Sequence, residues 1–355
     1  MKITELSLTN FRNYKKAHFH FSQNTNVFVG KNAKGKTNLI EAIYLLSVSK
    51  SFRTRQLSDV VMFNQPFSKI IGHLDISHRP YLVEMVVSKE GKKARINGKE
   101  INRSSDFVGI FNVIIFTPDD LMLVKGSPKE RRRFIDLELS KIDINYLHDL
   151  NDYMHFLKQR NAYLKNENID DTFLSVLTKQ LVEVEQRVIL KRMSFISRLS
   201  QKARQTYSKI ASSNELLTIQ YDCFCDLEKI EVDHLMHLYD VNKKRDCRFC
   251  MTHIGVHKDD LIVLLDGNQA STFASQGQQR TIVLALKIAL LELICEEIGE
   301  YPVLLLDDVL SELDTSRQND LLDLIDDRIQ TFITTTSMEG LTHTTIQKAK
   351  KFEIK

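Results

Sequence analysis

The residues with the clearest chemistry are consecutive: residues 30–37 read Gly-Lys-Asn-Ala-Lys-Gly-Lys-Thr. They match G-x-x-x-x-G-K-T, the phosphate-binding P-loop, whose glycines allow a tight turn that points backbone N–H groups at phosphate oxygens. Lys36 supplies a point charge for the β- and γ-phosphates, and Thr37 supplies a hydroxyl for Mg²⁺. The pattern predicts a nucleotide site formed by Gly30, Lys31, Asn32, Ala33, Lys34, Gly35, Lys36 and Thr37.

The sequence on both sides of the loop supplies the elements that must position it. Residues 25–29 are typical of a buried strand, and residues 38–46 are typical of a helix. The N-terminal dipole of that helix would add to the anion site. The alternative is a chance match on a glycine-rich turn, and the strand–loop–helix context argues against it.

A second pair of candidate residues follows a buried apolar strand at residues 303–306. Asp307 is placed to hold Mg²⁺, and Asp308 is placed to act as general base on the attacking water. An acidic pair after a strand could also be a helix N-cap or a turn. In small GTPases and RecA-type motors the two motifs usually lie much closer along the chain, so this site must be assembled from both ends of the chain.

A third motif, Ser275-Gln276-Gly277-Gln278, opens a predicted helix that continues to residue 297. A serine and a glycine at a helix start offer a hydroxyl and N–H groups to an anion. The arrangement resembles the signature motif of ABC-type ATPases, which closes over ATP bound by a partner subunit; the alternative is an ordinary capped helix. By the same resemblance Ser275, Gly277 and Gln278 act in trans, and Ser311 and Asp314 lie in a D-loop.

The opening segment Leu8-Thr9-Asn10-Phe11-Arg12-Asn13-Tyr14 resembles the L-x-N-F-R-x-[YF] start of the SMC/Rad50/RecF branch of these ATPases. The insert between the half-sites is far too short for the coiled coil of SMC or Rad50 proteins. With further matching stretches at 50–53, 116–121, 126–134, 157–161 and 255–261, the chain resembles the RecF family from end to end. The resemblance implies that Arg12 lies near the nucleotide phosphates or the dimer interface.

The chain departs from the patterns of these families at a few positions. Ala33 replaces the usual P-loop glycine, which puts nucleotide affinity rather than binding in question. Asp308 replaces the catalytic Glu of ABC transporters, although a pair of aspartates is RecF-like. Residues 334–337, Thr-Thr-Thr-Ser, stand in the place of the transporter switch His, and no clear Q-loop glutamine is present near residues 117–120.

The composition is that of an ordinary globular chain. The 355 residues are 43% hydrophobic and 27% charged, with a net charge of +3, which neither demands nor excludes a nucleic-acid partner. No apolar run approaches the roughly 20 residues of a membrane span, and no signal-peptide segment is recognisable. We therefore expect a cytoplasmic protein with no membrane partner and with reduced cysteines.

The predicted fold is α/β: an ABC-type ATPase head, a P-loop NTPase with a mixed sheet, carrying an inserted α-helical lobe. Residues 1–125 hold the first part of the ATPase lobe, 126–212 the helical insert, and 213–355 the remaining ATPase part. Two long helices with apolar seams are expected in the insert, joined by a turn at 166–171. Strands are expected at 216–225 and 252–256, among others.

Cysteine spacing raises one further possibility, a zinc site. Zinc could be held by Cys223, Cys225, Cys247 and Cys250 with His253. Alternation along the predicted strand instead places Cys223 and Cys225 on one face, where small apolar side chains pack well. The family resemblance implies no zinc.

Basic residues gather around two segments and are the candidates for DNA contacts. The candidates are Lys50, Arg53, Arg55, Lys92, Lys93 and Arg95, and a further basic face is expected at Arg187, Lys191, Arg198 and Lys202. Such contacts give affinity without sequence readout. The alternative for each cluster is a solvated charged surface, and no base-reading module is recognisable.

Two functions remain open from the sequence. The first, implied by the resemblance, is a DNA-repair ATPase in which ATP and Mg²⁺ join two chains into a closed dimer that binds single-stranded, gapped or duplex DNA. It would hydrolyse ATP slowly in a DNA-dependent manner, with RecR and RecO as partners in loading RecA, and would serve replication forks and SOS induction. The second is a nucleotide-binding subunit that powers a transporter or another partner protein.

Overall fold

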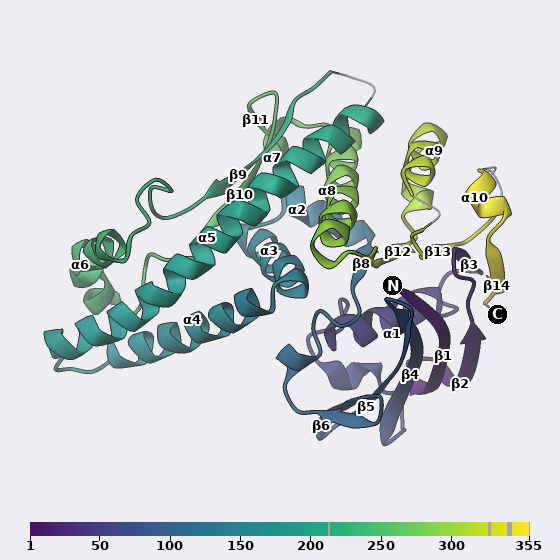
Figure 1. The fold of residues 1–355 in the computed structure, drawn as a ribbon, viewed down its shortest axis with the longest axis horizontal. Helices are drawn as coiled ribbons and strands as arrows, with labels where there is room; N and C mark the ends of the chain where they lie inside the picture. The colour runs from purple at the N-terminus through teal and green to yellow at the C-terminus, as the bar shows by residue number, and fades with distance from the viewer. Residues whose placement is uncertain (212–213, 326–327, 339–342, 355) are drawn as a thin grey trace. The chain divides into compact units, whose positions relative to one another are not determined.

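The computed structural model describes residues 1–211, 214–325, 328–338 and 343–354 (Figure 1). The chain divides into two compact units, one of residues 1–120 with 287–355 and one of residues 121–286. The predicted helical lobe at 126–212 covers only part of the second unit, which continues to residue 286. The predicted boundary at 212–213 lies outside the described residues, and the three-part division stays a prediction.

The first unit contains an antiparallel sheet of six strands in the order β2-β1-β4-β5-β6-β7. Its strands are β1 (Lys2–Phe11), β2 (Tyr14–His20), β4 (Phe67–Ile76), β5 (Arg79–Ser88), β6 (Gly91–Ile96) and β7 (Lys99–Ile101). Along β1 the buried residues Leu6 and Leu8 alternate with the half-exposed Ser7 and Thr9, as expected of a strand with one face on the core. Asn97-Gly98, a dipeptide typical of tight hairpin turns, joins β6 to β7.

The second sheet of this unit has five strands in the order β14-β3-β13-β12-β8, all parallel to their neighbours. Its strands are β3 (Thr25–Val29), β8 (Val113–Phe116), β12 (Val303–Asp307), β13 (Thr331–Thr335) and β14 (Lys350–Glu353). Thr335 pairs with Val29, and Thr334 pairs with Asp307. The P-loop and Asp307 therefore follow strands that end at the same edge of the sheet.

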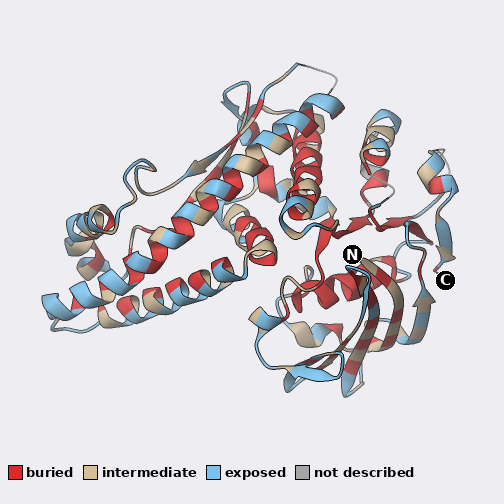
Figure 2. Cartoon of the chain, viewed as in Figure 1, coloured by how far each residue is buried: buried red, intermediate tan, exposed pale blue. Residues whose placement is uncertain are grey.

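Helix α1 (Lys36–Val48) contacts strands of both sheets. Its apolar residues Leu39, Ile40, Ile43, Leu45 and Leu46 are all buried, which accounts for the absence of a polar face in the sequence of this helix. Helices α9 (Thr315–Leu324) and α10 (Thr344–Gln347) complete the unit together with the later part of α8 (Gln276–Ile298). Figure 2 shows the buried residues continuing from α1 into the strands of both sheets.

The second unit is mainly helical and carries one small antiparallel sheet in the order β11-β10-β9. The 40-residue helix α5 packs against α4, α6 and β9. The elements are α2 (Met122–Lys125), α3 (Pro128–Ile142), α4 (Ile144–Tyr163), α5 (Asp171–Ile210), β9 (Leu217–Asp222), α6 (Val232–Phe249), β10 (Asp260–Leu265), β11 (Asn268–Gln269), α7 (Ala270–Phe273) and the start of α8. No helix among the described residues has both the length and the apolar character needed to cross a bilayer.

The two long helices and the turn between them lie where they were predicted: α4 ends at Tyr163 and α5 begins at Asp171. Helix α4 begins after Asp143, whose carboxylate accepts a hydrogen bond from the Tyr146 N–H and caps the helix. Met154 of α4 is 52% exposed and so lies outside the buried face of this helix. Helix α6 was not predicted, because only Leu235, Tyr239 and Asp246 of its 18 residues are buried.

The strand predicted at residues 252–256 is a loop. Its backbone bonds to side chains instead of to a neighbouring strand: Thr252 N–H donates to Asn161, and Val256 N–H donates to Glu185. Gly255 adopts φ +122°, a conformation that other residues rarely reach. A Cβ at this glycine would lie 2.6 Å from the Tyr153 hydroxyl, so the loop and the helices pack too closely for a side chain here.

Candidate nucleotide-binding site

The P-loop runs from β3 into α1 as predicted, and its lysine lies inside the loop. The Lys36 Nζ donates to the carbonyls of Gly30 at 2.5 Å and Lys31 at 3.0 Å, and the side chain is 7% exposed. Gly35 takes φ +108° and Ala33 takes φ +65°. Left-handed conformations at both positions are what turns the N–H groups inward, and Ala33 adopts one although it carries a Cβ.

The β1–β2 turn braces the loop from outside. Asn13 Nδ2 donates to the Lys34 carbonyl at 3.0 Å, and the Tyr14 hydroxyl donates to the Gly35 carbonyl at 3.2 Å. Burial raises the pKa of Tyr14 to about 12, so it remains a donor at neutral pH. The sequence prediction missed both bracing residues, although they belong to the same opening motif as Arg12.

Gly30 is fixed by a different neighbour, the end of β14. A Cβ on Gly30 would lie 2.3 Å from the Ile354 carbonyl oxygen, well inside van der Waals contact. The Ile354 N–H in turn donates to the Val29 carbonyl at 2.8 Å. Glycine at position 30 is therefore required by the close approach of two backbones.

Asp307, at the end of β12, joins the P-loop through hydroxyl groups. Its Oδ1 accepts hydrogen bonds from Thr37 Oγ1 at 3.0 Å and Thr334 Oγ1 at 2.8 Å. Burial raises the pKa of the Asp307 carboxyl, while these two hydrogen bonds oppose the shift. Both bonds use Oδ1, so among the described residues Oδ2 is left to serve as a ligand for a cation.

Asp308 has a strained backbone and is tied to the same threonine. Its φ is +56°, and its N–H donates to Thr334 Oγ1 at 2.8 Å. The Ser311 hydroxyl donates to the Asp308 carbonyl at 2.7 Å. Thr334 thus positions both aspartates; it was noted in the sequence only as the counterpart of the transporter switch residue.

Arg12 makes its contacts with a carboxylate on α1. Its guanidinium donates to both oxygens of Glu41, at 2.8 and 2.7 Å, and to the Asp59 carbonyl at 2.8 Å. Glu41 is fully buried and also accepts from Ser51 and Arg53. Glu41 is the one acidic residue in this apolar helix. That position could have identified it as a site residue, but the sequence prediction did not include it.

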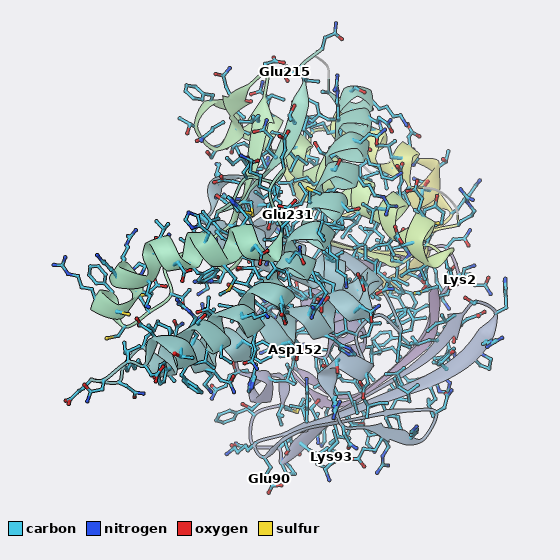
Figure 3. All side chains as sticks on the ribbon, turned by 60° about the vertical axis from the view of Figure 1, so that its left-hand side comes forward. Lys2, Glu90, Lys93, Asp152, Glu215 and Glu231 are labelled. Atoms are coloured by element: carbon cyan, nitrogen blue, oxygen red, sulfur yellow. The ribbon has the colours of Figure 1, made fainter. Side chains whose placement is uncertain are left out.

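The signature residues belong to the second unit and form a helix cap. Ser275 N–H donates to Gln278 Oε1 at 2.6 Å, and Gln278 N–H donates to Ser275 Oγ at 3.2 Å, which is a reciprocal capping box at the start of α8. Gln278 Nε2 also bonds Glu215, labelled in Figure 3 at the approach to β9. Ser275 is exposed and Gly277 half-exposed.

The D-loop residues have local partners. The Asp314 carboxylate caps α9 by accepting a hydrogen bond from the Arg317 N–H at 3.0 Å.

The segment at residues 117–120, where a Q-loop glutamine was sought, is also fixed by side-chain contacts. Asp120 forms an ion pair of 2.7 Å with Lys287 of α8 and accepts a hydrogen bond from the Thr117 N–H. All of these residues belong to the first unit.

The six basic residues predicted to contact DNA differ in their own contacts and in their exposure. Lys92 Nζ bonds the Ser49 carbonyl at 2.9 Å and so caps α1, and Arg53 bonds Asn38 at 2.6 Å. Lys50, Arg55, Lys93 and Arg95 are exposed; Figure 3 shows Lys93 on the outer side of the β5–β6 hairpin. On α5 the predicted basic face is directed partly at α4, because Arg187 and Lys191 both pair with Asp149.

The cysteines are free thiols, and the strand that was expected to carry two of them ends at Asp222. Cys223 and Cys225 place their sulfurs 3.5 Å apart in the following loop. His253 Nδ1 lies 3.0 Å from the carboxylate of Asp246, which accepts its hydrogen bond. Among the described residues, these cysteines do not form a group of three metal-ligand side chains.

Comparison with known proteins gives consistent results over the whole chain. The model of the family described as the RecF/RecN/SMC N terminal domain matches residues 2–352. The DNA replication and repair protein RecF of Geobacillus kaustophilus is 44% identical over 363 residues, covering 100% of this chain and 98% of that protein. RecF of Bacillus subtilis is 43% identical over 364 residues, with the same coverage.

Solved structures of similar proteins cover almost the whole chain. The recombination mediator protein RecF with ATP, from the RecFOR pathway, superposes with a TM-score of 0.90 at 32% identity and covers 99% of this chain and 95% of that one. An Smc head bound to the C-winged helix domain of ScpA gives a TM-score of 0.56 at 18% identity, covering 95% and 90%; this likeness bears on the fold alone. The predicted α/β ATPase head and the predicted family resemblance are both confirmed.

Proposed function

Because the chain belongs to the RecF family, we propose that it is an ATP-dependent DNA-binding protein of recombinational repair, replication-fork maintenance and SOS induction, working in the cytoplasm. ATP joins two copies, the closed dimer holds single-stranded, gapped or duplex DNA without reading its sequence, and slow hydrolysis reopens it. Its partners in helping RecA load are RecR and RecO, in keeping with the RecFOR pathway named for a similar structure.

One observation supports this proposal most directly: the 3.0 Å hydrogen bond between Thr37 and Asp307, residues 270 positions apart. It brings the P-loop hydroxyl and the carboxylate of the β12 end to one place in the first unit. A hydroxyl beside a buried carboxylate is the donor set that Mg²⁺ uses beside nucleotide phosphates. The sequence match and the geometry thus indicate the same ligand, an ATP–Mg²⁺ complex.

The residues divide the chemistry in a specific way. Lys36, already enclosed by the loop, neutralises phosphate charge, and the N–H groups of residues 30–37 hold the phosphate oxygens. Thr37 and Asp307 would hold Mg²⁺, which supplies charge neutralisation on the phosphates when bound. Asp308 accepts a proton from the attacking water, since its backbone is fixed by Thr334 and Ser311.

The dimer is part of the proposal because the signature residues complete the site from the partner copy. Ser275, Gly277 and Gln278 lie at the start of the long helix α8, and the N-terminus of a helix favours an anion. Ser311 and Asp314 lie after Asp308 and would meet the same interface. Hydrolysis is then expected only in the closed dimer, and DNA would stimulate it by favouring closure.

The test compares DNA binding and size by chromatography for wild type, Lys36→Ala and Ser275→Arg, each with and without ATP and Mg²⁺. Wild type should dimerise and bind gapped DNA only with ATP. Both variants should stay monomeric, and Ser275→Arg should still bind ATP. Ser175→Arg, on the exposed side of α5, is the matched control. ATP-independent DNA binding of wild-type strength by Lys36→Ala would contradict the proposal.

A further inference from the structure

Three metal-ligand side chains meet on the first unit, on the outer face of the antiparallel sheet. Glu5 of β1 and His18 and His20 of β2 place their ligand atoms within 4.8 Å of one another. They are the only group of three or more such side chains found among the described residues. The mechanism proposed above does not use them.

The strand register explains why these side chains share one face. Glu5 pairs with His20, and Ser7 pairs with His18. Alternation along β1 buries Leu6 and Leu8 against the core, so Glu5 and Ser7 point to the other face, as do their partners across the strand pair. On the opposite side of β1, Glu5 pairs with His73 of β4, which adds a third imidazole to the same face.

The ligand atoms are close enough together to share one ion. His18 Nε2 lies 2.9 Å from His20 Nε2 and 3.8 Å from Glu5 Oε2. The other ring nitrogen of His20, Nδ1, lies 3.3 Å from Glu5 Oε1, and one of the two His20 nitrogens would bind the ion. Ligand atoms about 2.0–2.1 Å from a tetrahedral ion are separated from one another by roughly 3.3 Å. His73 Nε2 lies 4.0 Å from Glu5 Oε2, close enough to reach a fourth position after a small rotation.

The orientation of the His18 ring is also fixed by a hydrogen bond to its second nitrogen. The Ser7 hydroxyl lies 2.7 Å from His18 Nδ1, so the other ring nitrogen of His18 is the one directed at Glu5 and His20. A hydrogen bond to the non-ligating nitrogen is the usual device that orients a histidine at a metal site and sets its tautomer. Ser7 therefore serves as a positioning residue.

We propose that Glu5, His18 and His20 bind one Zn²⁺ ion, or a similar divalent transition metal, with the fourth position open to water or His73. Two imidazoles and one carboxylate suit Zn²⁺ far better than Mg²⁺ or Ca²⁺, which prefer oxygen ligands. The ion would fasten the edge strand β2 to β1. These strands meet at the turn whose Asn13 and Tyr14 brace the P-loop.

The test is a zinc titration of the full-length protein by calorimetry, in excess Mg²⁺ so that the nucleotide site does not compete. Wild type should bind one Zn²⁺ per chain and melt at a higher temperature with zinc. The double variant His18→Asn/His20→Asn should lose both effects. Ser7→Ala keeps all three ligands and should bind about tenfold more weakly. His237→Asn, an exposed histidine of α6, is the control and should behave as wild type.

Cobalt distinguishes this site from the cysteines. Co²⁺ bound by imidazole and carboxylate gives a visible d–d band without the near-ultraviolet charge-transfer band of thiolate ligands. We expect the first band alone, absent in the double variant and unchanged in Cys223→Ser/Cys225→Ser. A thiolate band, zinc binding retained by the double variant, or no zinc binding by wild type would each overturn the proposal, the last leaving a hydrogen-bonded pair of histidines.

Discussion

The hydroxyl of Thr37 donates a hydrogen bond to the carboxylate of Asp307, and the same carboxylate oxygen accepts a second one from Thr334. The carboxylate is thus oriented by hydroxyl groups from two different segments. Because burial raises the pKa of the Asp307 carboxyl, its charged form is less favourable than in water, and a cation beside it would offset that cost.

Asp307→Asn separates stability from activity. The amide oxygen can still accept both hydroxyls, but the buried charge is gone. We expect ATP hydrolysis to fall about 100-fold, while the melting temperature of the nucleotide-free protein stays equal or rises. Steady-state hydrolysis and thermal denaturation are the measurements. A large loss of stability together with the activity would show that the carboxylate is structural.

Ala33 can be probed by changing only its backbone preference. Its φ of +65° lies in the left-handed region, which costs an L-residue about 1–2 kcal/mol. Ala33→Gly removes that strain from the folded state but makes the unfolded chain more flexible. Because the two effects oppose each other, the free energy of unfolding should change by less than about 1 kcal/mol. ATP should bind equally well or more tightly. Ala33→Val should weaken ATP binding about tenfold, because a β-branched residue is a genuine outlier there. Equal ATP affinity in all three proteins would contradict this.

Arg12→Ala tests whether that residue is structural. Removing the guanidinium leaves Glu41 buried and short of its main partner, which we expect to cost about 3 kcal/mol of unfolding free energy. Arg12→Ala/Glu41→Gln should recover part of the loss, because the uncompensated charge is then removed. If Arg12 acts mainly on the phosphates, Arg12→Ala will instead unfold like wild type and bind ATP poorly.

A buried carboxylate in the second unit links stability to pH. Glu185 is enclosed by α5, α6 and the loop at Val256, and burial raises its pKa from 4.5 to about 7. The folded state therefore holds a proton that the unfolded state releases between these pH values, and its contribution to stability falls as pH rises from 4.5 to 7.

Glu185→Gln removes this dependence. Relative to wild type, the variant should gain on the order of 3 kcal/mol of unfolding free energy between pH 4.5 and pH 8. Burial lowers the pKa of the nearby His257 to about 4, so the contribution of His257 to stability rises as pH rises from 4 to 6.5. In wild type this rise offsets part of the decrease in stability that Glu185 causes. Denaturant unfolding at a series of pH values measures both proteins; a constant difference between them would contradict the assignment.

Lys93 and Lys92 are neighbours on β6 with different expected effects. Lys93→Glu should weaken DNA binding and reduce the dependence of log K on log salt by about 1 or more, whereas Glu90→Lys on the same hairpin should do the reverse. Lys92→Ala removes the cap on α1 and should destabilise the fold by about 1 kcal/mol, with little change in salt dependence. Equal salt slopes in all variants would exclude this hairpin from the DNA surface.

Much of the site could be predicted from local patterns. Each motif is a run of consecutive residues, and the strand or helix that positions it lies next to it in the sequence. The P-loop, β3 and α1 are of this kind, and β3 and the start of β12 lie at the predicted residues. Thr334, Glu41 and Asn13 were missed as site residues because their importance depends on pairing between distant segments. No local pattern shows which hydroxyl or carboxylate will lie beside them.

The errors in the second unit have a related cause. The loop at 252–256 looks like a strand because it contains apolar and β-branched residues, but its backbone partners are the side chains of Asn161 and Glu185. Helix α6 buries too narrow a face for its period to be visible in the sequence. In the loop at 252–256, tertiary contacts outweighed local preference.

The close approach of Ile354 to Gly30 joins β14 to the nucleotide loop, although the two are far apart along the chain. Strand β14 lies at the edge of its sheet, where it pairs with β3, so the same backbone contacts shape the loop and protect this strand. Cleavage by trypsin after the exposed Lys350 or Lys351 should consequently slow when nucleotide steadies the loop, which would make β14 a label-free reporter of occupancy.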